Sequence, residues 1–122
     1  MNQSKLEQLA NLVPATPKMI AEWLMKIENA GQDTLAIVLT CFKLGYDEET
    51  HTGLLNELHT TFGVDGVARE METIWRLNDA EQQYAYMIEF NLTTDASIML
   101  ANLAADFYEF KKMKRHLEGF EL

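Results

Sequence analysis

Glu48 and His51 have the spacing Glu-x-x-His, which places a carboxylate and an imidazole on one face of a helix. Helical di-iron carboxylate proteins use two such motifs, one on each of two helices. This sequence has no second motif, because Asn56 stands three residues before His59 and His116 lies among lysines that would repel a cation. We therefore expect no metal and no other cofactor. A ligand- or metal-binding helical enzyme is the alternative, in which carboxylates such as Glu48 meet His51 only after folding.

The side chains that could act as nucleophiles lack a catalytic setting. Cys41 lies in an apolar run, with only Lys43 close enough in sequence to stabilise a thiolate. The two serines, Ser4 and Ser97, are not flanked by the glycines of a nucleophile elbow, and no glycine-rich phosphate loop is present. We predict a packing role for Cys41, in the reducing environment of the cytosol, and a protein that is not an enzyme.

Acidic residues dominate the charge of the chain. Its 122 residues include 19 Asp and Glu against 10 Lys and Arg, which gives a formal net charge of -9. Four of the ten basic residues lie near the C-terminus, where they oppose the negative end of a helix dipole: Lys111, Lys112, Lys114 and Arg115. Direct nucleic-acid binding is not expected, because the rest of the chain repels phosphate. A helix-turn-helix regulator is a second alternative, although no basic recognition helix is present.

Length and composition favour one helical domain over residues 1–122. The 48% of hydrophobic residues suffice for one core, and no linker, repeat or charge block divides the chain. The N-terminus has no charged leader followed by an apolar block, and no stretch approaches the ~18 apolar residues of a membrane span. We expect a cytoplasmic protein with no membrane association.

Residues 94–117 have the longest unbroken helical pattern. Their apolar stripe consists of Ala96, Leu100, Leu103, Phe107, Phe110 and Leu117, widened by Met99, Ala104 and Met113. Thr94 or Asp95 is expected to cap the start, and Gly119 follows the end. The sequence therefore predicts one long C-terminal helix that packs against several others.

Caps, prolines and glycines mark the other predicted helices. The first runs from Ser4 to Pro14, and the second follows the Thr16 cap and ends at Gly31. The others are residues 33–44, 47–62, 65–77 and 80–91. Gly45 ends the third of the predicted helices, and Asp79 begins a capping pattern before the sixth. The predicted inward faces are Met19, Ile20, Trp23, Leu24 and Ile27 in the second helix, Leu54, Leu55, Leu58 and Phe62 in the fourth, Val67, Met71, Ile74 and Trp75 in the fifth, and Tyr84, Met87, Ile88 and Asn91 in the sixth.

Two segments also fit a strand. Residues 35–42 are apolar on nearly every side and rich in β-branched residues, and residues 84–92 alternate with a period of two. Helix is favoured for both, because their neighbours are helical and a lone strand would leave its backbone unpaired. The predicted fold class is all-α: a single-domain bundle of about six helices, with a long C-terminal helix and an apolar third helix at its centre.

Surplus aromatic rings and acidic residues indicate an interaction surface. The candidate interface residues are Tyr86, Phe90, Tyr108, Glu48 and Glu49. We predict a non-catalytic acidic interaction module, such as an adaptor, assembly factor or inhibitor, whose partner is another protein with a basic surface; a homodimer through the same residues is an alternative. The sharpest form of this hypothesis is a phage or mobile-element inhibitor of a nucleic-acid-binding protein. It requires the carboxylates to line one exposed surface.

Overall fold

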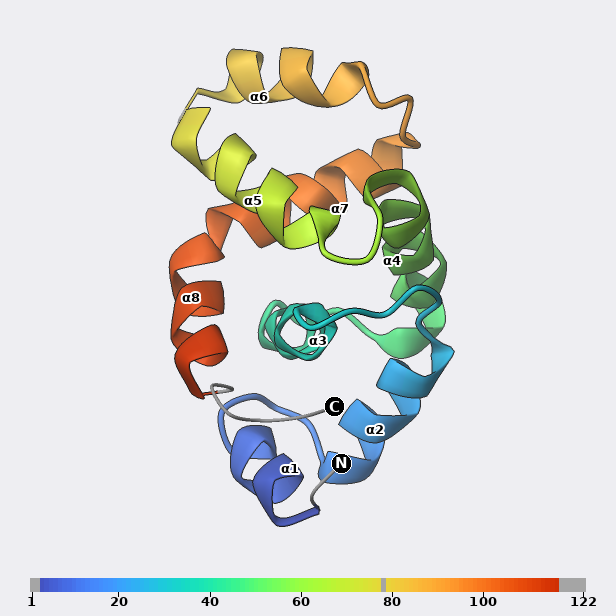
Figure 1. The fold of residues 1–122 in the computed structure, drawn as a ribbon, viewed down its shortest axis with the longest axis vertical. Helices are drawn as coiled ribbons and strands as arrows, with labels where there is room; N and C mark the ends of the chain where they lie inside the picture. The colour runs from blue at the N-terminus through green and yellow to red at the C-terminus, as the bar shows by residue number, and fades with distance from the viewer. Residues whose placement is uncertain (1–2, 78, 117–122) are drawn as a thin grey trace.

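The computed structural model describes residues 3–77 and 79–116, and this part of the chain is all-α (Figure 1). Its eight helices are α1 (Gln3–Ala10), α2 (Pro17–Lys26), α3 (Thr34–Lys43), α4 (Glu48–Phe62), α5 (Gly66–Leu77), α6 (Ala80–Ile88), α7 (Thr94–Ala105) and α8 (Phe107–His116). No strand occurs in these residues. The prediction of helix over strand is therefore confirmed for residues 35–42 and for the part of residues 84–92 that has regular structure. The predicted fold class is confirmed, with eight helices in place of about six.

The third helix is the centre of the bundle, as predicted. Every side chain from Thr34 to Phe42 is buried. In Figure 1, α3 is seen end on in the middle of the ribbon, and α2, α7 and α8 pack against it. A helix that is apolar on nearly every side can bury all of its surface only in such a position.

Side-chain caps set the start of several helices. The Thr16 hydroxyl accepts a hydrogen bond from the Met19 amide at 3.1 Å, and the Asp79 carboxylate accepts one from the Glu81 amide at 2.9 Å. Both residues were predicted as caps. In α7 the cap is Thr93 instead of Thr94 or Asp95, because the Thr93 hydroxyl accepts from the Ala96 amide. These bonds satisfy amides that have no partner within the helix.

The C-terminal segment corrects the prediction of one long helix. Asp106 leaves the helical conformation, with φ -97° and ψ 18°, and separates α7 from α8. The helix divides here because its halves have different partners: α7 packs on α4 and α5, whereas α8 packs mainly on α3. The predicted stripe still faces the core in both halves, since Ala96, Leu100, Leu103, Phe107 and Phe110 are all buried. Leu117 and Gly119 lie outside the described residues.

Other predicted boundaries and faces also need correction. The second helix was predicted to end at Gly31, but it ends at Lys26. The next residue, Ile27, has an extended backbone, and its amide donates to the Leu24 carbonyl. Four side chains predicted to face the core are exposed by 43% to 66%: Met19, Trp75, Tyr84 and Ile88. Asn91 is exposed as well. Helices at the periphery bury only one stripe, so apolar residues at the edge of that stripe stay at the surface.

One histidine belongs to the core. His59 is 1% exposed, and its Nδ1 lies 2.9 Å from the Leu55 carbonyl, which can only accept. The Nδ1 atom therefore carries the proton, and Nε2 is left to accept from the Thr34 hydroxyl at 3.4 Å. The Thr34 oxygen in turn accepts from the Gly31 amide at 2.7 Å. Burial lowers the pKa of His59 and favours this neutral form.

Candidate interaction site at the start of α4

A tight turn brings the start of α4 close to the end of α3. Gly45 has φ +84°, a conformation that side chains with a Cβ rarely adopt, and it reverses the chain after α3. The Tyr46 amide then bonds the Cys41 carbonyl at 2.9 Å. Asp47 follows as the cap of α4, and its Oδ1 accepts from the Thr50 amide at 2.7 Å. This hydrogen bond lowers the pKa of Asp47, so its carboxylate is charged at neutral pH.

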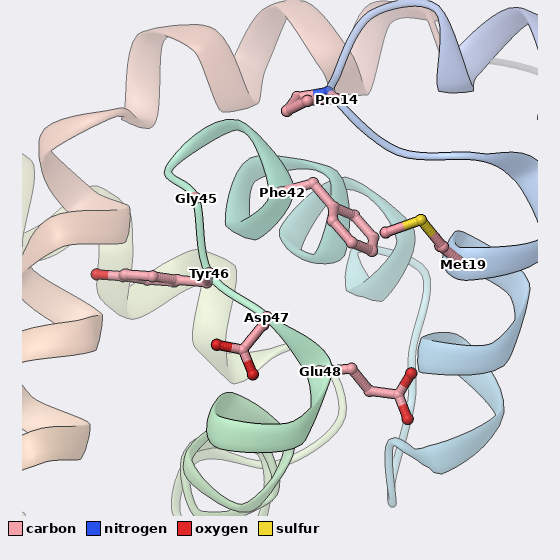
Figure 2. A pocket seen from close by; sticks show the side chains of 7 residues that line it. All are labelled: Pro14, Met19, Phe42, Gly45, Tyr46, Asp47 and Glu48. Carbon is pink, nitrogen blue, oxygen red and sulfur yellow. The ribbon is translucent and has the colours of Figure 1, made fainter.

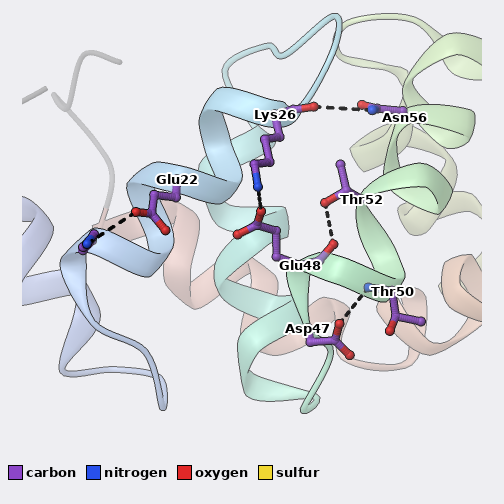
Figure 3. Close-up of polar contacts among 8 residues, drawn as sticks. Glu22, Lys26, Asp47, Glu48, Thr50, Thr52 and Asn56 are labelled. Atoms are coloured by element: carbon purple, nitrogen blue, oxygen red, sulfur yellow. Dashed lines mark hydrogen bonds and ion pairs between the residues drawn. The ribbon is translucent and has the colours of Figure 1, made fainter.

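Glu48 joins α4 to α2. Its carboxylate pairs with the ammonium of Lys26, which raises the pKa of the lysine. Farther along α4, Asn56 accepts from the Glu28 amide at 2.8 Å and donates to the Lys26 carbonyl at 3.4 Å. Figure 3 shows the Lys26 contacts side by side between the two helices. Contacts of Lys26 and Asn56 thus link the two helices on one side of the candidate site.

A pocket of about 230 Å³ opens between these elements. It is lined by Pro14, Met19, Phe42, Gly45, Tyr46, Asp47 and Glu48 (Figure 2). Phe42 is nearly buried, whereas Met19 is 43% exposed and its side chain lies next to the Phe42 ring. Asp47 and Glu48 also line the pocket, and in Figure 2 the Asp47 carboxylate points to the side of Tyr46, whereas that of Glu48 points to the side of α2. The pocket therefore combines an apolar wall with an acidic rim.

Tyr46 and His51 form a stacked pair of rings beside the acidic residues of the pocket. Their rings stack with centroids 4.3 Å apart and an interplanar angle of 15°. Asn102 donates a hydrogen bond to the Tyr46 hydroxyl at 2.7 Å, which ties the turn to α7. Since both ends of Tyr46 are engaged, the turn that carries Asp47 has little freedom to move.

The same contacts separate the two residues of the Glu-x-x-His spacing. Glu48 reaches across to Lys26, whereas His51 turns back, so that its Nδ1 lies 3.0 Å from the Asp47 carbonyl oxygen and 3.2 Å from the Asp47 amide nitrogen. Within residues 3–77 and 79–116, no three His, Cys, Asp or Glu side chains gather in a way that could hold a metal ion. In the structure, Glu48 contributes to the pocket and His51 supports the turn.

The structure places the five candidate interface residues on three parts of the fold. Glu48 lines the pocket, and Glu49 is exposed beside it in the first turn of α4. Tyr108 is 64% exposed on α8, with the Lys112 ammonium 5.3 Å from its ring centroid. Tyr86 lies on α6, and Phe90 follows that helix.

The orientation of α6 differs from the predicted one, because Met87 alone of the four residues predicted to face inward is buried. Tyr86 and Phe90, predicted to lie off the inner face, are half-buried, and their rings pack 5.2 Å apart. Phe90 also packs against Phe62 at 4.9 Å. The Tyr86 hydroxyl donates a hydrogen bond to the Glu70 carboxylate. Burial is the main cause, and the Glu70 carboxylate the second, that raises the pKa of Tyr86 to about 12. The side of α6 that packs on α5 therefore carries Tyr86, and Tyr84 faces solvent.

Sequence reasoning missed most of the pocket. Asp47 was recognised only as the start of the fourth helix, and Met19 and Phe42 only as core residues. Pro14 and Gly45 were recognised only as helix boundaries. The single local signal was the cluster of acidic residues from Asp47 to Glu49, two residues after the glycine that ends the third helix. The apolar wall comes from segments that are distant in sequence, so no local pattern predicts it.

Charge is segregated along the fold. The stretch from residue 47 to residue 106, which forms α4 to α7, contains twelve Asp and Glu residues and two basic residues, Arg69 and Arg76. Seven of the twelve are exposed: Asp47, Glu49, Asp65, Asp79, Glu81, Glu89 and Asp95. The described basic residues of the C-terminal end lie on α8, at another part of the ribbon (Figure 1).

Together, these features define an all-α protein with an acidic four-helix region and a small acid-rimmed pocket. No protein-family model, curated protein or solved structure matches the chain. None of the helices in the described residues has both the length and the apolarity needed to cross a membrane.

Proposed function

We propose that this chain is a non-catalytic interaction protein that binds a basic surface of another protein. The observation that carries this proposal is the excess of carboxylates on α4 to α7, seven of them exposed. A protein region with charge of one sign attracts surfaces of the opposite sign and repels nucleic acid. The most specific form of the partner is a nucleic-acid-binding protein whose basic surface the acidic region covers, as an inhibitor from a phage or mobile element would do.

The groups with reactive chemistry have structural partners, which supports a binding role. His59 bonds Thr34 and the Leu55 carbonyl in the core. His51 supports the turn through the backbone of Asp47. Cys41 is fully buried, and burial raises the pKa of its thiol, so the reactive thiolate is disfavoured. A buried reduced thiol fits our proposal that the protein acts in the cytoplasm.

Binding to small DNA-binding domains tests the proposal. The purified protein is titrated against several such domains with basic surfaces and against folded domains of acidic surface. We expect at least one basic domain to bind, with an affinity that falls as salt is added and with DNA as a competitor. Binding to none of the basic domains at low salt, or equal binding to the acidic ones, would overturn the proposal.

A matched pair of charge variants locates the surface. Glu49→Gln, Glu81→Gln and Glu89→Gln together remove three exposed carboxylates from the acidic region. The control combines Glu7→Gln, Glu22→Gln and Glu28→Gln, which changes the net charge equally but lies on exposed positions outside that region. We expect the first variant to bind the basic domain more weakly than the control. Equal losses would mean that only the net charge matters.

A further inference from the structure

The lining of the pocket at the start of α4 is complementary to a long basic side chain. Lysine and arginine carry an apolar stem and a charged head, and they bury the stem along apolar surface while the head meets a charge or water. Met19 and Phe42 provide an apolar wall, and Asp47 and Glu48 provide carboxylates at the edge of the same pocket. We propose that this pocket receives one lysine or arginine side chain of the basic partner. This inference rests on the proposed function and names the contact that the pocket makes.

The charge balance at the rim favours a cation. The N-terminus of a helix carries roughly half a positive charge, which a single carboxylate neutralises. The start of α4 presents three acidic residues, Asp47, Glu48 and Glu49. Lys26 compensates Glu48, and the His51 ring lies 3.7 Å from the Asp47 carboxylate, which it compensates only when it is protonated. Capping and dipole compensation therefore account for part of the negative charge, and the remainder is available to a bound cation.

Both rim carboxylates retain capacity to accept hydrogen bonds. Each ionised carboxylate has about four acceptor positions. Asp47 accepts from the Thr50 amide with Oδ1, and its side chain is 60% exposed. Glu48 pairs with Lys26 through Oε1. A guanidinium or ammonium entering the pocket can therefore bond to these groups without breaking the cap of α4.

Lys26 acts as an internal substitute for the partner's cation. Its ammonium already pairs with Glu48 at the rim, but its side chain is 60% exposed and its stem belongs to α2. An exposed ion pair of this kind contributes little to stability, so a competing cation can displace it. Removal of the Lys26 charge should therefore strengthen binding, whereas a purely structural role for Glu48 predicts no such gain.

The apolar wall is the part of the pocket that helix capping does not explain. Met19 is exposed on α2 beside Phe42, although a polar residue at that position would be equally compatible with an exposed helix surface. In the proposed complex, the stem of the basic side chain covers Met19. Apolar contact and charge then act together, which distinguishes this pocket from the rest of the acidic surface.

Titration followed by protein NMR tests the inference. The probes are N-acetyl-arginine amide, N-acetyl-lysine amide and N-acetyl-norleucine amide, which has the stem without the charge. We expect either basic probe to shift the backbone amides of Gly45, Tyr46 and Glu48 in a saturable way, and norleucine to bind more weakly. The arginine and lysine probes show which head the rim prefers. Equal binding of norleucine, or unsaturable shifts spread over Glu81 and Glu89, would overturn the inference.

Variants assign the contacts. Glu48→Gln should weaken binding of the basic probe about two- to fivefold, and Lys26→Met should strengthen it by a similar factor, as expected for exposed ion pairs. Met19→Gln, at an exposed helix position, should weaken binding without loss of fold. Glu28→Gln is the control, since Glu28 is exposed and does not line the pocket. No gain in the Lys26 variant, together with unchanged binding in the Met19 variant, would refute the pocket.

The two proposals fail in different ways. If a basic domain binds the acidic region and neither Glu48→Gln nor Met19→Gln alters that binding, the proposed function stands and the pocket inference is wrong. If the basic probes occupy the pocket and no basic domain binds, the pocket recognises a cation but the proposed function is wrong.

Discussion

Glu57 of α4 accepts two hydrogen bonds from Thr93, one from its backbone amide and one from its hydroxyl, both at 2.8 Å. The same Thr93 hydroxyl accepts from the Ala96 amide and so caps α7. A carboxylate 36 residues earlier in the chain therefore orients the residue that starts α7. This contact helps to place α7 against α4.

Thr93→Ala should lower the free energy of unfolding by about 1–2 kcal/mol, because it removes both a helix cap and a bond to Glu57. Thr93→Ser should retain most of the stability. Chemical denaturation provides the measurement, and Thr94→Ala at an exposed neighbouring position is the control. Alanine is a better helix former than threonine, so a loss in the Thr94 variant as large as that in Thr93→Ala would show that the effect is not specific to the Thr93 cap.

Gly31 and Gly53 should respond to alanine in opposite directions. A Cβ at Gly31 would lie 2.4 Å from the Val64 Cγ1 and 2.6 Å from the Val64 carbonyl oxygen, so the loop before α3 would have to move. We expect Gly31→Ala to cost about 1–3 kcal/mol. Gly53 is an exposed helix residue with open space at its Cβ, and Gly53→Ala should stabilise by about 0.5–1 kcal/mol.

Thermal unfolding of both alanine variants measures these effects. If Gly31→Ala is as stable as the native protein, the α2–α3 loop and the α4–α5 loop do not approach as closely as described.

His59 should make stability depend on pH in the weakly acidic range. Its pKa is lowered in the folded protein, chiefly by burial, whereas the unfolded chain takes up the proton near pH 6.5. The contribution of neutral His59 is therefore complete above pH 6.5 and decreases as the pH falls below that value toward the folded pKa. Denaturant titrations at a series of pH values measure the slope.

Two histidine variants distinguish the source of this slope. His59→Gln removes the titrating group and should flatten the slope, although it lowers stability at neutral pH. His51→Gln keeps His59 and should keep the slope that His59 causes. An unchanged slope in His59→Gln would assign the pH dependence to other groups.

Trp23 should tolerate phenylalanine far better than alanine. Its side chain is fully buried and packs edge-on against Phe42, with ring centroids 5.0 Å apart. Its Nε1 is buried without a hydrogen-bond partner among the described protein atoms, so phenylalanine removes an unsatisfied donor along with part of the ring. Trp23→Ala should cost about 3–5 kcal/mol, and Trp23→Phe much less. Equal losses, measured by chemical denaturation, would indicate that the Nε1 proton makes a stabilising bond.

Local patterns in the sequence predicted most of the helices. The hydroxyl of Thr16 and the carboxylate of Asp79 cap the helices for which they were proposed. Asp47, predicted as the first residue of the fourth helix, caps it. The uniformly apolar segment from Thr34 to Phe42 is buried at the centre. Capping bonds span only two or three residues, and the burial of an apolar stripe follows from its period. Both can therefore be predicted without knowledge of the tertiary structure.

Only the tertiary structure determined the break at Asp106, the orientation of α6 and the pocket beside Asp47. A continuous apolar stripe does not specify whether one partner or two will cover it, so the division into α7 and α8 depended on where α3 and α5 lie. The orientation of α6 depended on which of its faces could contact α5. The pocket depended on the approach of Met19 and Phe42 to Asp47, since side chains distant in sequence meet only when the helices that carry them have packed.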